Sequence, residues 1–449
     1  MIQRWVTGIE RLAAVASRFP HSAYAGLVSC LSAEWQYICR TVPGVGPSLA
    51  PVENALRTKF IPAIIGVDGP IDDDLRTLLG NGVKTGGLAI RDPTLAAASL
   101  YSASVESTGM LTGTLIRNEP INVEAHRNNV RAAGAKHRKT RRDGEVAFHT
   151  ALMERSPPKV KKRMERATAT GAWLSTIPDR FSGTELTKDE WLDNVAIRYG
   201  QRPADLPDHC DGCSSGLTLE HGLSCKRGGL VGIRHDDVRD EWAHLCSIAL
   251  TDSRIVIEPT IFYGNGSRAG GNNATPTTPL TVNNTTPTTP RNANQTNTLG
   301  DEARGDVLAH GFWNRGRGCV FDVRICDTDS RSYGNTSSCK ILERHAKEKK
   351  DKYENACLDR RRDFTPLVYS VDGMASKDAR TAERRIAWLL AKKWSRTYSD
   401  MANFIRTRMS LAIVRSNTLL LRGDRTSPMR RRSPSDGTAA TCADHLRND

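Results

Sequence analysis

The sequence predicts a mixed fold: an all-helical N-terminal region, a small cysteine-rich motif, and an α/β core with flanking helices. Apolar residues recur every three or four positions through much of residues 1–120, which is the period of amphipathic helices. Three cysteines and a histidine are clustered at 210–225. After residue 254, short β-rich runs alternate with helical stretches, which indicates strands and helices in one domain.

The chain is long and strongly basic. Its 449 residues are enough for two or three domains, each with its own core. Lysine and arginine outnumber aspartate and glutamate by 64 to 50, which gives a formal net charge of +14. Because the basic residues are clustered, we expect a polyanionic partner rather than an acidic small molecule, with a merely basic protein as the alternative. No run approaches the roughly 20 apolar residues of a membrane span, so we expect no membrane partner.

The cysteine count bears on the compartment. Eleven cysteines are an odd number, and the opening MIQRWVTGIERLAAVASRF lacks the uninterrupted apolar core of a secretory signal. We therefore expect an intracellular protein, in the nucleus or the cytoplasm and not secreted. Its cysteines are then metal ligands or free thiols.

Three segments precede the cysteine motif. Residues 1–125 are predicted to form helices separated by Gly- and Pro-rich breaks. Residues 126–170 form a basic connector, which is either a solvated helix or an arm that tracks phosphates. Residues 171–205 are predicted to be a helical connection in which Trp191 and Val195 are buried. The connector residues expected to contact nucleic acid are Lys136, Arg138, Lys139, Arg141, Arg142, Lys161, Lys162 and Arg163.

After the motif, residues 231–263 and 301–422 are predicted to form one domain around an insertion. The insertion, 264–300, is a Gly, Asn, Thr and Pro tract that cannot offset the entropy cost of ordering, so we expect disorder. We expect the same of the basic tail at 423–449. Within the domain the expected elements are a helix at 235–251, strands at 254–258, 305–310, 319–326 and 364–371, a helix at 339–362, and two amphipathic helices within 377–422.

The cysteine motif has the spacing of a metal site. It reads Cys210-x2-Cys213-x7-His221-x3-Cys225, and a two-residue gap lets one turn present two sulfurs. Three thiolates and one imidazole would close a tetrahedral Zn²⁺ site, which is structural because no position is left for water. The alternative is a pair of free cysteines in a Gly- and Ser-rich loop. His209 and His235 are near enough in the sequence to replace the fourth ligand.

A second group of residues has the chemistry of phosphodiester hydrolysis. Such a reaction needs a divalent cation and a positioned water, and carboxylate oxygens suit Mg²⁺. Asp306 and Asp322, in adjacent strand segments, could hold one such ion. Lys349 and Lys352 lie three residues apart on one face of the following helix, where either could orient the attacking water. By spacing alone this is a weak signal, because a lysine-rich helix is usually a solvated face.

A family resemblance strengthens the second group. The order Cys-x2-Cys, His, Cys, then Arg234-His235-Asp236, Gly-Asp306, Phe-Asp322-Val-Arg and Lys349-x2-Lys352-Tyr resembles the C-terminal end of non-LTR retrotransposon proteins that carry a restriction-like endonuclease. Upstream, Glu34-Trp-x-Tyr, Leu56-Arg-Thr-Lys-Phe-Ile-Pro and Gly86-Gly-Leu-x-Ile-Arg-Asp-Pro resemble the thumb region of the same polyproteins. The likeness covers most of the chain outside the insertion and the tail.

The resemblance implies a thumb-like helical region at 1–125, a zinc knuckle at 206–230 and a restriction-endonuclease-like α/β core. It also implies that Asp306 and Asp322 hold Mg²⁺, that Lys349, or Lys352 as second choice, assists the water, and that Arg234 and His235 contact nucleic acid. The reaction would nick a DNA target and leave a 3′-hydroxyl that primes reverse transcription. The partners it implies are that DNA and, as a second partner, element RNA; the oligomeric state stays open.

The sequence departs from the family at three places. No Tyr-x-Asp-Asp signature is present, so we predict no DNA synthesis by this chain. Gly305 stands where the nuclease family has proline, and Arg324 stands where the standard motif has lysine. Because arginine stays protonated, it is a poor base, which leaves the lysine role to the following helix.

Two other functions remain open at this point. One is a nucleic-acid-binding remnant with a zinc knuckle whose nuclease has decayed. The other is a protein-interaction scaffold that uses the C-terminal helices, whose binding would be insensitive to salt. Glu241 is either a further acidic ligand or a solvated helix carboxylate.

Overall fold

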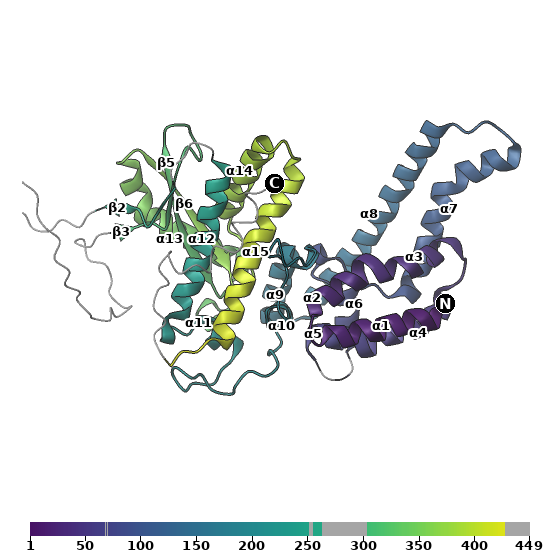
Figure 1. Cartoon of the computed structure of the whole chain (residues 1–449), viewed down its shortest axis with the longest axis horizontal. Coiled ribbons are helices and arrows are strands. Elements are labelled where there is room, and N and C mark those ends of the chain that lie inside the picture. The colour runs from purple at the N-terminus through teal and green to yellow at the C-terminus, as the bar shows by residue number, and fades with distance from the viewer. Residues whose placement is uncertain (68, 70, 251–254, 263–302, 427–449) are drawn as a thin grey trace, which may run out of the picture.

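The computed structural model describes residues 1–67, 69, 71–250, 255–262 and 303–426 (Figure 1). In this part of the chain the fold is mixed, mostly helical with a small mixed sheet, as the sequence predicts. The expected disorder of 264–300 and of 427–449 concerns residues outside the described ones.

The N-terminal region is a bundle of short helices. The helices are α1 (Ile2–Ala16), α2 (Pro20–Gly26), α3 (Ser32–Thr41), α4 (Ala50–Ala55), α5 (Ile61–Ile65) and α6 (Asp73–Gly80), with π-helical turns at Leu27–Leu31 and Leu56–Phe60. On α1, Trp5 and Ile9 lie one turn apart and are buried in the same core as Leu27 and Phe60. The Trp5 indole donates a hydrogen bond to Glu34 on α3, which fixes the first helix against the third.

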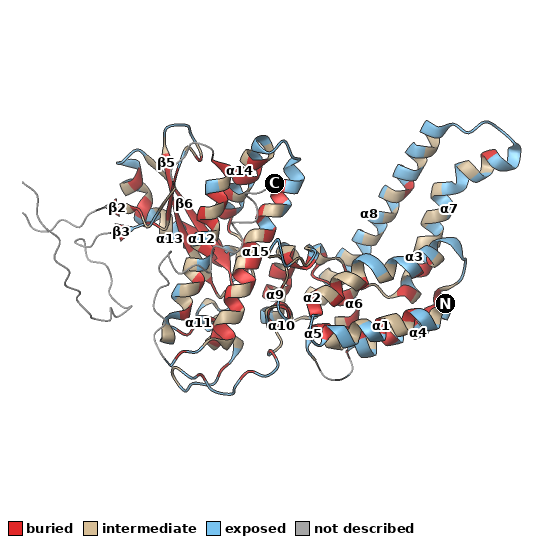
Figure 2. Cartoon of the chain, in the orientation of Figure 1, coloured by how far each residue is buried: buried red, intermediate tan, exposed pale blue. Residues whose placement is uncertain are grey.

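A helical hairpin extends from this bundle (Figure 1). It consists of α7 (Pro93–Arg117) and α8 (Val123–Arg155), whose N-termini are capped by the Asp92 and Asn122 side chains. Most of α8 is exposed, and Ala133 is its only fully buried residue (Figure 2). The part of the basic connector that forms α8 is therefore a largely solvated helix that extends away from the bundle.

Two helices connect the hairpin to the rest of the molecule. They are α9 (Pro158–Ala169) and α10 (Lys188–Tyr199). The second begins with a capping box formed by Thr187 and Glu190. Its Trp191 is fully buried in the N-terminal core and donates to the Ile64 carbonyl at 2.8 Å, so the predicted burial of Trp191 is confirmed.

The C-terminal region is a sheet between layers of helices. Its elements are α12 (Leu230–Ala249), β1 (Ile255–Ile257), β4 (Val307–His310), β5 (Gly318–Cys326), α13 (Ser338–Leu358), β6 (Arg362–Ser370), α14 (Lys377–Lys393) and α15 (Tyr398–Arg422). The short strands β2 (Thr260–Phe262) and β3 (Ala303–Arg304) pair separately. Within the described residues the main sheet has the order β1-β4-β5-β6, antiparallel except for the parallel pair β5 and β6, which α13 connects.

Strand periodicity decides which helix each sheet residue meets. Phe321 and Val323 of β5 pack in one core with α12, α14 and α15, whereas Val320 packs in another core with residues of α13. Because successive side chains alternate between faces, Asp322 is directed to the same face as Val320, toward α13. The sheet thus presents this aspartate to the helix that carries Lys349.

A buried ion-pair network joins α9 to this sheet region. Arg166 is 1% exposed at its side chain, and it contacts Asp329 at 2.8 Å and Asp372 at 2.6 Å. Burial disfavours its charge, but the two carboxylates outweigh burial and raise the pKa of Arg166. Arg163, one turn earlier, also contacts Asp329, at 3.0 Å.

Truncation of this network should be costly. We expect Arg166→Ala to lower the free energy of unfolding by about 3–5 kcal/mol, because it removes the arginine paired with Asp372 and leaves Asp329 with Arg163 alone. The exposed pair of Arg4 and Glu34 is a suitable comparison: Arg4→Ala should cost about 0–1 kcal/mol. Urea unfolding of both variants measures the two losses in free energy of unfolding. Equal losses would show that the buried ion pairs of Arg166 contribute no more to stability than an exposed pair.

Two boundaries differ from the predicted ones. The helix expected at 235–251 begins five residues earlier, at Leu230. Residues 423–426, which were assigned to the disordered tail, are ordered: Arg425 is 4% exposed and its backbone N–H donates to the Asp211 carboxylate at 2.7 Å. The tail prediction is therefore wrong for these four residues, because a buried arginine attaches them to the cysteine-rich loop.

Candidate metal centre and acidic site

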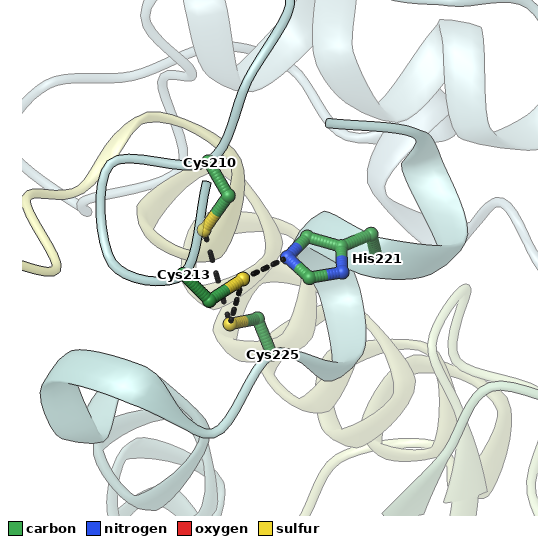
Figure 3. A group of neighbouring side chains, drawn as sticks. All are labelled: Cys210, Cys213, His221 and Cys225. Atoms are coloured by element: carbon green, nitrogen blue, oxygen red, sulfur yellow. Dashed lines mark hydrogen bonds between the residues drawn. The ribbon is translucent and has the colours of Figure 1, made fainter. Parts of the chain in front are cut away.

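The four predicted zinc ligands converge in one place (Figure 3). The donor atoms of Cys210, Cys213, His221 and Cys225 all lie within 4.8 Å of one another. Sulfur–sulfur distances from Cys225 are 3.9 Å to Cys210 and 4.0 Å to Cys213, and the Cys213 sulfur is 3.2 Å from His221 Nε2. A tetrahedral ion with Zn–S bonds of about 2.3 Å separates two sulfurs by roughly 3.8 Å. The donor set and its spacing therefore suit a metal ion such as zinc.

Local structure explains how the ligands meet. The first two cysteines lie in a tight turn in which the Ser214 N–H donates to the Cys210 carbonyl and Ser214 has a left-handed φ of 59°. The short helix α11 (Leu219–Ser224), capped by Thr218, carries the histidine and ends at the fourth ligand. This Cys3His loop, residues 206–230, packs its Leu217 and Leu223 against α15.

The electrostatics of the Cys3His loop favour a bound cation. Hydrogen bonds with Ser215 lower the pKa of Cys213 to about 6, so this thiol is largely a thiolate at neutral pH. Burial raises the pKa of Cys225, which would stay neutral without a cation nearby. Metal binding requires thiolates, so a bound ion would release a proton from Cys225.

The two predicted magnesium ligands lie on neighbouring strands. Asp306 precedes β4, and its N–H donates to the Phe321 carbonyl at 2.9 Å, while its carboxylate accepts from the Val323 N–H. The paired register of β4 and β5 begins at Val307 opposite Phe321, so Asp306 and Asp322 flank the first pair of the ladder. They are near enough for the charge of Asp306 to raise the pKa of Asp322. The sheet therefore brings the two carboxylates together.

The lysine predicted as first choice contacts this pair. The Nζ atom of Lys349 on α13 lies 2.6 Å from Asp322 Oδ2, and the aspartate is 5% exposed. Burial raises the pKa of Asp322, Lys349 opposes that shift, and the Asp306 charge adds to it. Lys352 is exposed instead, with its ammonium 4.8 Å from the centroid of the Tyr353 ring.

His235 belongs to the same site. Its Nε2 lies 3.1 Å from Asp306 Oδ2 and its Nδ1 lies 3.4 Å from Asp236. Burial disfavours the imidazolium, but the two carboxylates outweigh burial and raise the pKa of His235 to about 9. The sequence suggested nucleic-acid contact or a substitute zinc ligand for this residue. In the structure it is the cationic partner of Asp306.

Gly305 has a structural reason to replace proline. A Cβ atom at this position would lie 2.4 Å from Val320 Cγ1, a distance that real Cβ atoms essentially never show. Because proline carries a Cβ, it would require the strand to move. The departure from the family pattern is thus consistent with close approach of the backbone to β5.

Two other residues near the sheet have structural partners. Glu241 on α12 forms a bidentate ion pair with Arg408 on α15, with N–O distances of 2.7 and 2.9 Å. Arg324 of β5 pairs with Glu348 at 3.1 Å. Neither residue contacts the aspartate pair through a hydrogen bond or an ion pair described in this structure, so Glu241 behaves as a helix carboxylate held by arginine.

The predicted nucleic-acid contacts fall into two groups. The exposed group is on α8, where Arg138, Lys139 and Arg142 face solvent, Arg141 is partly buried, and Lys136 pairs with Glu106 at 2.8 Å. Lys161 on α9 is partly buried.

The second group of predicted nucleic-acid contacts is buried or paired with other groups of the protein. Lys162 donates to the Gly334 carbonyl at 2.6 Å, Arg163 pairs with Asp329, and Arg234 is 4% exposed. Burial lowers the pKa of Arg234 to about 10. Lys162 and Arg234 are poorly placed to contact a phosphate, because they are only 6% and 4% exposed. Arg163 already has a carboxylate partner.

Comparison with known proteins adds no assignment. No model of a known protein family matches the chain, and no curated protein matches it. Across the described parts of the chain, no helix is both long and apolar enough to cross a membrane.

Proposed function

We propose that the chain is a divalent-metal-dependent endonuclease that nicks DNA, as the resemblance to restriction-like retrotransposon nucleases implies. One observation carries the proposal. Asp306 precedes β4, Asp322 lies in the middle of β5 and Lys349 lies on α13, and the three come together beside β5 with a 2.6 Å contact between the last two.

The acidic pair suits Mg²⁺ with few protein ligands. Among the described residues, the Cys3His group alone unites three or more His, Cys, Asp or Glu donors within 4.8 Å, so the pair has no third such ligand at that spacing. Mg²⁺ is commonly held by one or two carboxylates, with waters and substrate phosphates completing the octahedron. The pair Asp306 and Asp322 would then bind the ion together with the DNA phosphate.

In the proposed reaction, a water loses a proton to solvent and attacks the scissile phosphorus, and the P–O3′ bond breaks. The leaving 3′-oxygen keeps the electron pair and takes up a proton, so the products are a 3′-hydroxyl and a 5′-phosphate. A bound ion would stabilise the negative charge of the reacting phosphate and lower the pKa of a water. The ammonium of Lys349, which contacts Asp322 in this structure, would orient the attacking water and offset charge on the phosphate.

The Cys3His loop has a separate role in this proposal. Its four protein ligands would close the coordination sphere of a zinc ion, which is the arrangement of structural sites. The loop packs on α15, which also contacts α12 and α14, so a bound zinc would support the helical layer behind the sheet.

A binding protein without nuclease activity is the second candidate. The ion pairs favour it: His235 and Lys349 already neutralise both aspartates, which is a stable arrangement without any metal. The zinc site and the exposed basic face of α8 would serve such a binder equally well. A cleavage assay separates the two candidates.

The direct test is nicking of a supercoiled plasmid by the full chain. The proposal requires open-circular product with Mg²⁺, none without it, and nicks that DNA ligase reseals because they carry a 3′-hydroxyl and a 5′-phosphate. Binding of the plasmid without any metal-dependent product would favour the second candidate.

Lys349→Met should lower the nicking rate by about 10²-fold or more while plasmid binding persists, because it removes the group that positions the water. The matched change Lys352→Met should cost less than about tenfold, because an exposed ammonium acts only through screened long-range charge. Initial rates of nicking at saturating Mg²⁺ measure both. Equal losses of nicking rate in the two variants would show that Lys349 has no role in the reaction that Lys352 lacks.

A further inference from the structure

A large groove separates the helical hairpin from the C-terminal helices. It has a volume of about 1060 Å³. One wall is α8 with the turn at Val83–Thr85, and the other is α14 and α15. Residues 168–172, Ser175 and residues 373–375 of the connection between β6 and α14 also line it. We call it the arm cleft, and it does not include Asp306, Asp322 or Lys349.

The arm cleft is strongly basic on both walls. Its acidic lining residues are Glu145 and Glu383. Its basic lining residues are Lys84, Arg138, Lys139, Arg141 and Arg142 on the hairpin side and Arg380, Arg384 and Arg406 on the helical side. The excess of cations over carboxylates would attract a polyanion from both sides at once.

Most of these cations are available to a ligand. Arg141 lies 3.5 Å from Glu145, but among the described residues the other seven form no ion pair within 4.0 Å. Arg380, Arg384 and Arg406 are all exposed. This differs from the arginines that hold the fold together, such as Arg166 and Arg408, whose charges are matched by carboxylates. Structural ion pairing therefore does not account for the concentration of arginine here.

The lining also indicates which polyanion fits. Tyr369 is its only aromatic residue, and that ring is 1% exposed with its hydroxyl bonded to Glu383 at 3.0 Å. Proteins that hold single strands stack the bases on exposed aromatic rings, whereas duplexes are held through the phosphate backbone. Arginine forks match phosphate oxygens on two facing walls.

We infer that the arm cleft binds the phosphate backbone of a double-stranded nucleic acid. One wall would contact phosphates through Arg138, Lys139 and Arg142, and the facing wall through Arg380, Arg384 and Arg406. The inference deepens the proposed function, because it names a second contact surface for the nucleic acid away from the acidic site. It rests on nucleic-acid binding by the chain and not on cleavage.

Glu383 modulates the charge of this surface. Burial raises its pKa to about 7, while Tyr369 on β6, Arg406 on α15, and Arg380 and Arg384 on α14 oppose that shift. Cys246 on α12 lies behind the tyrosine. The carboxyl is therefore neutral below about pH 7 and charged above it, and the charged form opposes phosphate binding.

The test measures the affinity of the full chain for a fluorescent 20-base-pair duplex by anisotropy, in buffer without Mg²⁺. DNA duplex, RNA–DNA hybrid and single-stranded DNA of the same sequence form the three arms. We expect both duplexes to bind more tightly than the single strand. The ratio of their two affinities shows whether the DNA duplex or the RNA–DNA hybrid is the preferred ligand. Tightest binding of the single strand would overturn the inference.

Charge reversals locate the contact. Arg380→Glu with Arg384→Glu should weaken duplex binding by at least about tenfold and reduce the slope of log affinity against log salt by roughly two. Arg142→Glu should weaken it from the opposite wall. The control, Arg11→Glu with Lys59→Glu, makes the same charge change at exposed positions of the N-terminal bundle and should change affinity much less. Equal weakening by control and cleft variants would show a general charge effect and overturn the site.

Glu383→Gln should strengthen duplex binding, whereas the charge reversals above weaken it. At pH 8 it should bind the duplex more tightly than the unmodified chain, and at pH 6 the two should be equal, because the carboxyl is then protonated. If Glu383→Gln does not bind the duplex more tightly at pH 8, then Glu383 does not influence binding in the arm cleft. If the chain does not nick DNA but the cleft variants weaken duplex binding as expected, only the nuclease proposal is refuted. If the cleft variants bind the duplex as tightly as the unmodified chain, only the arm-cleft inference is refuted.

Discussion

Asp306→Asn and Asp322→Asn should each reduce Mg²⁺-dependent nicking by about 10³-fold or more. A metal ion contributes several kcal/mol of transition-state stabilisation, and each 1.36 kcal/mol corresponds to a factor of about ten in rate. With only two carboxylates from the protein, the loss of either leaves an ion held by one ligand. The measurement is the initial rate of plasmid nicking over a range of Mg²⁺ concentrations.

The control for these variants is Asp351→Asn. Asp351 is an exposed carboxylate on α13, two residues after Lys349, and should be dispensable. Thermal unfolding of all three variants shows whether the fold is retained. Nicking at the unmodified rate by either Asp306→Asn or Asp322→Asn, in a folded chain, would contradict the metal site.

Removal of Cys225, one of the four candidate zinc ligands, should have the largest effect on the fold. Cys225→Ala should abolish stoichiometric zinc binding and expose residues 206–230 to hydrogen exchange, because the small core of this loop cannot order it alone. Structural zinc contributes about 10–16 kcal/mol of apparent binding free energy in isolated zinc-finger peptides, which is folding free energy there. Mass spectrometry of the native protein and hydrogen exchange measure the two effects.

The expected disturbance extends beyond the loop. Leu223 and Leu230 pack with Leu420 and Leu421, so the C-terminal turns of α15 should exchange faster as well. Cys30→Ser is the matched control, because Cys30 is an exposed cysteine in the N-terminal bundle. One bound zinc and unchanged protection in Cys225→Ala would show that the ligand set is different or that the loop folds without metal.

The sequence could predict the Cys3His group because its information is local. All four ligands lie within sixteen consecutive residues, and a turn followed by one helix is enough to bring them together. The alternation along β5 is equally local: Phe321 and Val323 are apolar, so Asp322 between them is directed to the opposite face. The helix that meets that face comes from tertiary structure, and the resemblance alone indicated Lys349.

Residues whose role depends on distant partners were harder to predict. His235 lies 71 residues from Asp306 in the chain, and nothing in its neighbourhood indicates that contact. Arg380, Arg384 and Arg406 have the spacing of solvated helix faces, and only the fold places them opposite α8. Lys162 was assigned to nucleic acid because basic runs are usually solvated, and Arg234 because of the family resemblance. Here packing buries them, as the carbonyl contacts of Lys162 show.

A crystal of the full chain soaked in Mn²⁺ tests the central claim most directly, since Mn²⁺ accepts the same oxygen ligands and gives an anomalous signal. The account predicts a peak between the carboxylates of Asp306 and Asp322, with Lys349 displaced from Asp322. An absence of that peak at millimolar Mn²⁺, with the lysine still in contact with the aspartate, would contradict a metal-dependent nuclease.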